Sequence, residues 1–215
     1  MITNLNFMLL TNFSNSSFSS IYSYLSFIEK CLQGGVNCIQ LREKNLAPNE
    51  LLSFAKNLKS LLDKYNIPLI INDNVILAKT INASGVWLGQ SDSAPSKARD
   101  ILGGDKIIGV SIESEQDIEI TNNQPINYVA CSAVFASKSK SNLKKIWGLD
   151  GLQQVALKSK FSCFAIGGIT LNNLSEVMNH GAYGIACINE IHEDKNPKTL
   201  CEKFTQIINT SIKEN

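Results

Sequence analysis

Several features are scarce in this sequence, and each scarcity excludes a class of protein. The 215 residues include 20 Lys and Arg against 19 Asp and Glu, which gives a formal net charge of +1. A chain so balanced lacks the broad basic surface that attracts nucleic acid or anionic lipid. No apolar run approaches the roughly 18 residues of a membrane-spanning helix. We therefore expect neither a nucleic-acid nor a membrane partner, and any anion must bind at a site built locally.

Targeting and disulfide signals are also missing. The opening residues, MITNLNFMLLTNF, have neither the basic start nor the cleavage site of a signal peptide, so we expect a cytoplasmic protein. No CxxC pair occurs, and four of the six cysteines lie in apolar runs that resemble strands. Buried, reduced thiols are therefore expected at Cys31, Cys38, Cys131, Cys163, Cys187 and Cys201.

What is present is a regular alternation of short apolar runs and longer amphipathic stretches. With 44% hydrophobic residues the chain can bury a sizeable core, as a globular enzyme does. The amphipathic stretches predict helices, for example over residues 48–66 and 171–182. Strands are predicted at residues 6–10, 37–42, 67–72, 85–89, 106–111, 127–135, 161–168 and 184–189.

This order of elements predicts the fold. Repeated strand-helix units indicate a parallel sheet with right-handed crossovers. Eight such units favour closure into a (β/α)8 TIM barrel, with a doubly wound open sheet as the alternative. No linker, low-complexity block or charge run marks a second domain, so residues 1–215 are predicted to form one catalytic barrel. In that fold the functional site lies where the strands end and the following loops begin.

Unusual polar residues fall at those strand ends. In the stretch CIQLREKN, residues 38–45, Gln40 and Arg42 share one face of an otherwise apolar strand, and burying them without partners would be costly. Convergence on one barrel mouth explains these two residues together with the groups near the ends of later strands. Those groups are Lys44, Asn72, Asp73, Gln90, Asp92, Ser111, Ser137, Lys138, Ser139, Lys140, Gly167, Gly168, Ile188 and Asn189.

Two anion sites are predicted from these residues. The carboxylates of Asp73 and Asp92, beside an amide, suit Mg²⁺, which keeps several waters and often takes phosphate oxygens as ligands. With Arg42, Lys44 and Lys140 as cations, they describe a site for a magnesium-bound diphosphate. The glycine pair that precedes a helix predicts a second phosphate site, near the last two strands.

Each group also has a purely structural interpretation when it is taken alone. Asp73 and Asp92 could cap the helices that follow them, and Gly167 with Gly168 could serve only turn geometry. Arg42 could form a surface ion pair that stabilises little. Agreement among so many strand ends favours the functional interpretation.

The chain resembles the thiamine phosphate synthase family, also called thiamine-phosphate pyrophosphorylase, over most of its length. The resemblance lies in the order and approximate spacing of several runs from about residue 6 to residue 191: QLREK, INDN, GVWLGQSD, GVS, VFASKSK, AIGGIT and GIACINEI. It implies a transferase of thiamine biosynthesis that joins a hydroxymethylpyrimidine diphosphate to a thiazole phosphate, with Mg²⁺ as cofactor, and releases pyrophosphate. Its partners would be these small phosphorylated molecules, and a homo-oligomer is compatible with the sequence.

The resemblance also implies a role for individual residues. The pyrimidine diphosphate would contact Gln40, Leu41, Arg42, Glu43, Lys44, Asn72, Ser111 and Lys140. Three of these, Arg42, Lys44 and Lys140, would take part in catalysis. The metal ligands would be Asp73 and Asp92. The thiazole phosphate would contact Ser137, Lys138, Ser139, Gly168, Ile188 and Asn189.

Two departures from the family pattern affect the pocket, and two rival functions remain open. Trp87 stands where a histidine is frequent, and Asn189 where a serine is common. The first rival is a thiazole tautomerase-like relative, which would need an acid-base histidine where this chain has Ala133. The second is a barrel that binds thiazole phosphate without catalysis, and such a binder need not retain both Asp73 and Asp92.

The synthase reaction itself needs no general base. If the C–O bond to diphosphate breaks first, the aminopyrimidine delocalises the resulting cation, and the thiazole nitrogen attacks without losing a proton. His180 and His192 are not placed as a pair, so we expect structural roles for both. Catalysis would then depend on positioning and on stabilising the leaving diphosphate.

Overall fold

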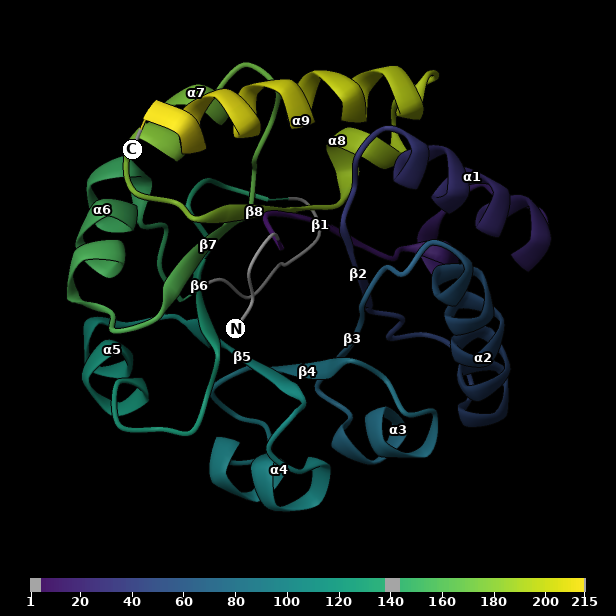
Figure 1. The fold of residues 1–215 in the computed structure, drawn as a ribbon, viewed down its shortest axis with the longest axis horizontal. Coiled ribbons are helices and arrows are strands. Elements are labelled where there is room, and N and C mark those ends of the chain that lie inside the picture. Colours follow the sequence, from purple (N-terminus) through teal and green to yellow (C-terminus); the bar gives the residue numbers. More distant parts are fainter. Residues whose placement is uncertain (1–4, 138–143, 215) are drawn as a thin grey trace.

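The protein is a closed barrel of parallel strands. The computed structural model describes residues 5–137 and 144–214, with side chains as far as Ile212. Eight strands pair in sequence order, and β8 returns to pair with β1. Figure 1 shows the helices arranged around this barrel. The predicted (β/α)8 TIM barrel is therefore confirmed, and the open sheet is excluded.

The elements follow one another in the predicted alternation. The strands are β1 (Phe7–Leu10), β2 (Cys38–Leu41), β3 (Leu69–Asn72), β4 (Gly85–Leu88), β5 (Ile107–Ile112), β6 (Tyr128–Ser132), β7 (Ser162–Ile166) and β8 (Gly184–Cys187). The helices are η1 (Phe13–Asn15), α1 (Ile21–Gln33), α2 (Pro48–Lys64), α3 (Val75–Thr80), α4 (Pro95–Leu102), α5 (Glu115–Thr121), α6 (Gly148–Lys158), α7 (Leu174–Asn179), α8 (Asn189–His192) and α9 (Pro197–Glu214). None of the described helices is long and apolar enough to cross a membrane.

The last three strands end earlier than predicted. β7 stops at Ile166 because Gly167 and Gly168 both adopt positive φ, at 97° and 65°, and so leave the extended conformation. The segment after β6 turns back toward β7, where the Val134 N–H donates to the Ile166 carbonyl. β8 ends at Cys187, and Asn189 opens a short helix. The residues between these strand ends and the next helices are therefore available to build a site.

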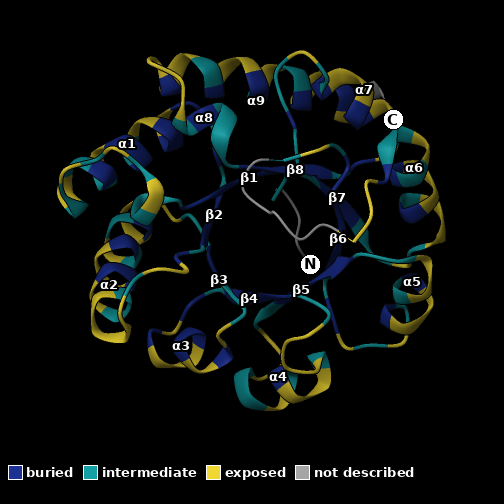
Figure 2. Cartoon of the chain, turned by 180° about the vertical axis from the view of Figure 1, so that it is seen from behind, coloured by how far each residue is buried: buried dark blue, intermediate teal, exposed yellow. Residues whose placement is uncertain are grey.

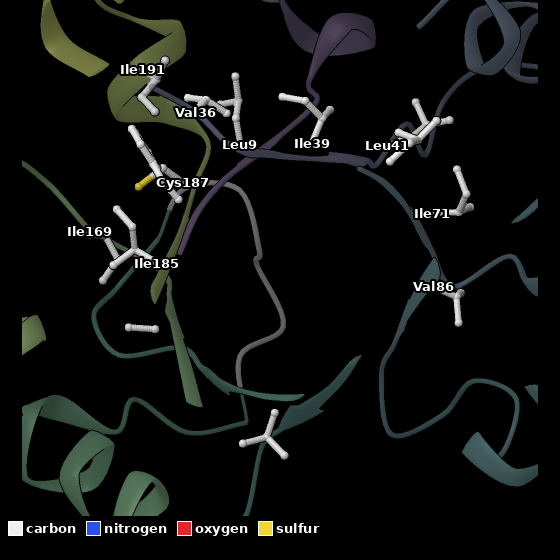
Figure 3. Packing of buried hydrophobic residues seen from close by; sticks show 14 of the residues in the cluster. Leu9, Val36, Ile39, Leu41, Ile71, Val86, Ile169, Ile185, Cys187 and Ile191 are labelled. Carbon is white, nitrogen blue, oxygen red and sulfur yellow. The ribbon is translucent and has the colours of Figure 1, made fainter. Parts of the chain in front are cut away.

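Two apolar layers hold the barrel together. Odd and even positions of each strand face opposite ways, and the outward set packs against the helices. Figure 3 shows part of this outer set, including Leu9, Ile39, Val86 and Ile185, which point away from the barrel interior. Burying a side chain of this size contributes roughly 1.5–3 kcal/mol. In Figure 2 the strands and inner helix faces are accordingly buried, while exposed residues lie on the outer surface.

The inward layer is smaller and more varied. It contains Met8, Leu10, Cys38, Ile70, Trp87, Tyr128, Ala130, Phe164 and Ala186. All six cysteines of the chain are free and buried, as the sequence predicted. Because these apolar side chains fill the barrel interior, polar inward residues are confined to the ends of the strands.

Candidate active site

Two adjoining cavities open where the strands end. The first, here called the β2–β5 cavity, has a volume of about 330 Å³ and is lined by residues that include Gln40, Lys44, Asn72, Asp73, Asp92 and Ser111. The second, the β7–β8 cavity, has a volume of about 300 Å³ and is lined by residues that include Ser137, Gly167, Gly168, Thr170, Ile188 and Asn189. Both cavities share Leu10, Arg42, Ser132 and Ile166. The predicted polar groups thus gather in two neighbouring spaces, with Arg42 between them.

The alternation within β2 explains how Gln40 and Arg42 reach the cavities. Ile39 and Leu41 belong to the outer layer, whereas Gln40 faces inward and is only 1% exposed. Its Nε2 lies 3.7 Å from Met8 Sδ, which is a weak acceptor. Burial lowers the pKa of Arg42, while the nearby carboxylates of Asp73 and Glu43 oppose that shift.

A pair of carboxylates lies at the ends of β3 and β4. Burial, followed by a hydrogen bond and charge repulsion from Asp92, raises the pKa of Asp73 to about 6, although Lys44 and Arg42 act in the opposite direction. Two acidic groups close enough to share a proton favour any cation that enters between them. Asp73 also has a left-handed φ of 62°, a conformation that Asp tolerates better than most residues.

The purely structural alternative, in which these two aspartates cap the following helices, is wrong. The N-cap of α3 is Asn74, whose Oδ1 accepts a hydrogen bond from Leu77 N at 2.8 Å. Asp92 precedes the start of α4, and its Oδ2 instead accepts from Gly89 N at 2.7 Å. Neither carboxylate is therefore used to begin a helix.

Ser111 is held by two neighbours from the end of β4. The Trp87 indole N–H donates to Ser111 Oγ at 2.8 Å, and the Gln90 side-chain amide donates to the Ser111 carbonyl. Ser111 is 8% exposed and lines the β2–β5 cavity. Both its side chain and its backbone are thus fixed in direction.

Two other residues predicted to contact the pyrimidine diphosphate point elsewhere. The Leu41 side chain packs in the outer layer. The Glu43 carboxylate accepts hydrogen bonds from Phe13 N at 2.8 Å and Ser14 N at 2.9 Å, at the start of η1. Neither lines the two cavities above, although both line a third cavity of about 350 Å³ together with Lys44, Asn72 and Asp73. Substrate contact by Leu41 or Glu43 stays a prediction.

The β7–β8 cavity is shaped mainly by backbone. A Cβ on Gly167 would lie 2.4 Å from Ala133 Cβ, and one on Gly168 would lie 2.6 Å from the Ala136 carbonyl oxygen. Their positive φ angles and this close approach both require glycine. The glycines therefore serve turn geometry and, at the same time, bring backbone to the cavity wall.

The loop after Gly168 is braced by two side chains. Asn173 donates from Nδ2 to the Gly168 carbonyl and accepts from Thr170 N, both at 2.9 Å. Glu190 accepts from Leu171 N at 3.2 Å and so ties this loop to α8. Ile188 and Asn189, both half-buried, lie at the start of α8 and line the same cavity.

Part of the predicted site falls beyond the described residues. Lys138, Ser139 and Lys140 lie outside them, and their predicted contacts remain predictions. Ser137 is described and lines the β7–β8 cavity. Of residues 137–140, only Ser137 belongs to the described part of the chain.

The β2–β5 cavity is lined by an ion pair that the sequence did not predict. Lys144 Nζ lies 3.2 Å from Glu113 Oε2, and both residues line the β2–β5 cavity. The position of Glu113 two residues after Ser111, and the basic run that contains Lys144, were the available signals. Neither specifies that these two side chains meet, because they come from different loops.

The two histidines are apart and have structural partners. His180 Nδ1 lies 2.6 Å from the Glu176 carbonyl at the end of α7. His192 Nδ1 lies 2.8 Å from the Ile188 carbonyl, and its Nε2 lies 2.7 Å from Tyr24 Oη. Burial lowers the pKa of His192, although the Ile188 carbonyl and Glu43 partly offset the shift. This geometry agrees with the expected structural roles.

Comparison with known proteins gives a consistent result. The family described as thiamine monophosphate synthase matches residues 14–191. The thiamine-phosphate synthase of Chlamydia abortus is 39% identical over 208 residues, covering 97% of this chain and 98% of that protein. That of Vibrio campbellii is 38% identical over 175 residues, covering 81% and 86%. A thiamine phosphate pyrophosphorylase from Pyrococcus furiosus superposes with a TM-score of 0.86 at 26% identity, covering 97% of each chain.

The barrel and these relatives first define a class of protein, namely a transferase enzyme with a TIM-barrel fold. Within that class, the chain belongs to the thiamine monophosphate synthase family and to thiamine biosynthesis. The resemblance seen in the sequence motifs is thereby confirmed.

Proposed function

We propose that this protein joins a hydroxymethylpyrimidine diphosphate to a thiazole phosphate, yielding thiamine phosphate and pyrophosphate. The observation that carries the proposal is the pair of adjoining cavities that share Arg42. One has carboxylates and cations suited to a diphosphate, and the other has a glycine turn suited to a single phosphate. We assign the reaction to one catalytic domain, residues 1–215, and to the cytoplasm.

The donor set in the β2–β5 cavity fits Mg²⁺. Among the described residues, no group of three or more His, Cys, Asp or Glu could hold a metal ion, so Asp73 and Asp92 would supply two carboxylates only. Water and diphosphate oxygens would complete the shell, which is how Mg²⁺ is often bound beside phosphorylated substrates. When bound there, Mg²⁺ would supply positive charge that neutralises the leaving diphosphate.

The chain's own residues would position the two substrates and stabilise charge. Arg42 and Lys44 would bind the diphosphate, together with Lys140 as the family resemblance implies. Gln40, Asn72 and Ser111 would contact the pyrimidine diphosphate deeper in the same cavity.

Bond breaking between the pyrimidine methylene and diphosphate leaves a cation that the aminopyrimidine delocalises. The thiazole nitrogen then forms the new bond from the adjoining cavity, without a proton transfer. The histidine contacts support this chemistry. His180 Nδ1 and His192 Nδ1 contact backbone carbonyls, and His192 Nε2 contacts Tyr24 Oη. Holding the two reactants in line supplies much of the rate enhancement in such a reaction.

A two-substrate assay tests the proposal. We expect pyrophosphate and thiamine phosphate in equal amounts when both substrates and Mg²⁺ are present, and neither product when one substrate is omitted. Conversion of a thiazole phosphate isomer without the pyrimidine would instead identify a tautomerase. Binding of thiazole phosphate with no product under any condition would identify a noncatalytic barrel.

A further inference from the structure

Among the described residues, Trp87 is the one large aromatic side chain that lines the β2–β5 cavity. It is 3% exposed, belongs to the inward layer, and lines that cavity. Its indole N–H donates to Ser111 Oγ at 2.8 Å. The contact joins β4 to β5 at the cavity floor.

The indole is held in this orientation by the layer beneath it. The rings of Trp87 and Tyr128 meet edge to face, with centroids 5.5 Å apart and an interplanar angle of 84°. Gly109, the register partner of Trp87 on β5, leaves the space that Tyr128 fills, since a Cβ there would lie 2.0 Å from Tyr128 Cζ. The direction of the N–H is therefore set by packing as well as by its hydrogen bond.

The chemistry of indole determines the role left for Ser111. An indole nitrogen can only donate, so Ser111 Oγ must be the acceptor in this contact. The hydroxyl proton of Ser111 is then available for a second partner, and the side chain lines the cavity beside Gln40 and Asn72. A neutral imidazole could donate or accept, and would leave the direction of the serine hydroxyl open.

We propose that Trp87 is a positioning residue that makes Ser111 a hydrogen-bond donor to an acceptor atom of the pyrimidine diphosphate. The inference rests on the proposed function and adds a specificity rule to it. The ligand is expected to present an acceptor, either a ring nitrogen or a phosphate oxygen, to the Ser111 proton, because the indole already occupies one of the two lone pairs of Oγ. An analogue that presents a donor at that point could use only the one lone pair of Oγ that the indole leaves, with the hydroxyl proton turned away from the ligand, and we expect it to bind more weakly.

The test compares Trp87→Phe, Ser111→Ala and the double variant. Trp147→Phe is the matched control, because the buried Trp147 Nε1 has no hydrogen-bond partner among the described residues. For both Trp87→Phe and Ser111→Ala we expect KM for the pyrimidine diphosphate to rise roughly 3- to 10-fold, the loss of one neutral hydrogen bond. KM for thiazole phosphate should stay within about 2-fold of the wild-type value.

The double variant gives the decisive result. If Trp87 acts through Ser111, the double variant should be no worse than Ser111→Ala alone, because the two effects share one hydrogen bond. Fully additive losses, or equal rises in both KM values, would overturn the inference. A purely packing role for Trp87 would predict that second outcome. Trp147→Phe measures the effect of losing a buried indole that has no such hydrogen bond and lines neither cavity.

Calorimetric titrations distinguish a phosphate oxygen from a ring nitrogen as the acceptor. They also distinguish failure of this inference from failure of the proposed function. If Ser111→Ala binds pyrophosphate with Mg²⁺ more weakly, the acceptor is on the phosphate. If it binds the pyrimidine diphosphate more weakly but pyrophosphate as tightly as the wild type, the acceptor is on the ring. Unchanged binding of both would overturn the inference while wild-type turnover still supports the synthase. A wild-type protein that binds pyrophosphate but forms no thiamine phosphate would refute the proposed function instead.

Discussion

The two cavities of the barrel mouth differ in what they are made of. The β2–β5 cavity presents side chains, with Arg42, Lys44, Asp73 and Asp92 among its lining residues. The β7–β8 cavity is formed largely by a backbone turn at Gly167 and by the start of α8. A diphosphate with its metal requires formal charge of both signs, whereas a single phosphate can be bound by N–H groups. Under the proposed function, the comparison teaches that one barrel would bind two phosphorylated ligands by two different physical means.

The largest expected effect lies in the side-chain cavity. Asp73→Asn and Asp92→Asn should each lower kcat by roughly 10² to 10³, the scale seen when one well-placed electrostatic group is lost. Asn also tolerates the left-handed φ of Asp73, so the backbone should be retained. Steady-state rates over a range of Mg²⁺ concentrations measure the change.

An exposed aspartate provides the control for these variants. Asp63→Asn removes a carboxylate that bonds Lys59 at 2.8 Å on α2, and it should leave kcat unchanged.

Asp73→Asn should be at least as resistant to urea as the wild type without Mg²⁺, since it relieves the repulsion between two carboxylates. Wild-type rates in both site variants, or full activity in chelator, would remove the metal assignment.

A smaller, more selective effect is expected in the backbone cavity. Gly168→Ala should raise KM for thiazole phosphate about 10-fold, because the new Cβ would lie 2.6 Å from the Ala136 carbonyl oxygen and displace the turn. KM for the pyrimidine diphosphate should change little, since Gly168 does not line the β2–β5 cavity. The two KM values, measured at saturation with the other substrate, report the difference.

Gly148→Ala separates conformational strain from steric clash. Gly148 has a φ of 63°, close to the 65° of Gly168, but a Cβ there would meet nothing within 4 Å. Both variants should lose roughly 1–3 kcal/mol of stability through strain, and only Gly168→Ala should lose thiazole phosphate affinity. Equal KM changes in the two variants would show that strain, not the cavity wall, controls binding.

The smallest effect on turnover is expected at His192, which lines neither cavity. His192→Gln should leave kcat within a few-fold of wild type, yet cost roughly 1–3 kcal/mol of stability through the lost contact with Tyr24. Burial lowers the pKa of His192 below its ordinary value near 6.5. The unfolded chain therefore takes up this proton first as pH falls, so the stabilising contribution is complete above pH 6.5 and decreases below it.

Urea unfolding at pH 7.5 and pH 5.5 tests the predicted loss of stability at low pH. The free energy of unfolding should fall between these pH values in the wild type, and fall less in His192→Gln. His180→Ala, which alters an exposed histidine just after α7, should leave kcat near the wild-type value. A loss of 10²-fold or more in kcat at either histidine, in a folded protein, would contradict the base-free mechanism.

The sequence predicted the fold and the side-chain cavity better than the backbone cavity. Alternation in β2 was enough to turn Gln40 inward, and the ends of β3 and β4 were enough to bring Asp73 near Asp92. Such features depend on strand periodicity and parallel pairing, which are local or follow from topology. The ends of the strands were predicted less accurately. Gly167 and Gly168 continue the apolar pattern of β7 in the sequence, but their positive φ angles end the strand at Ile166.

Other features arise only from three-dimensional packing. The direction of the Trp87 N–H depends on Tyr128, two strands away, and the Glu43 carboxylate finds its partners in η1. The Lys144 and Glu113 ion pair joins two loops of different barrel units. No periodicity in one segment encodes such contacts, because each requires the other segment to be in place.

Simultaneous occupancy of the two cavities is the most direct test of this account. Thiazole phosphate is titrated calorimetrically into the protein alone and into protein saturated with Mg²⁺ and pyrophosphate. We predict one thiazole phosphate per chain in both cases, since we propose that pyrophosphate and thiazole phosphate bind in different cavities, which share Arg42. Mutually exclusive binding, with pyrophosphate displacing thiazole phosphate, would contradict it.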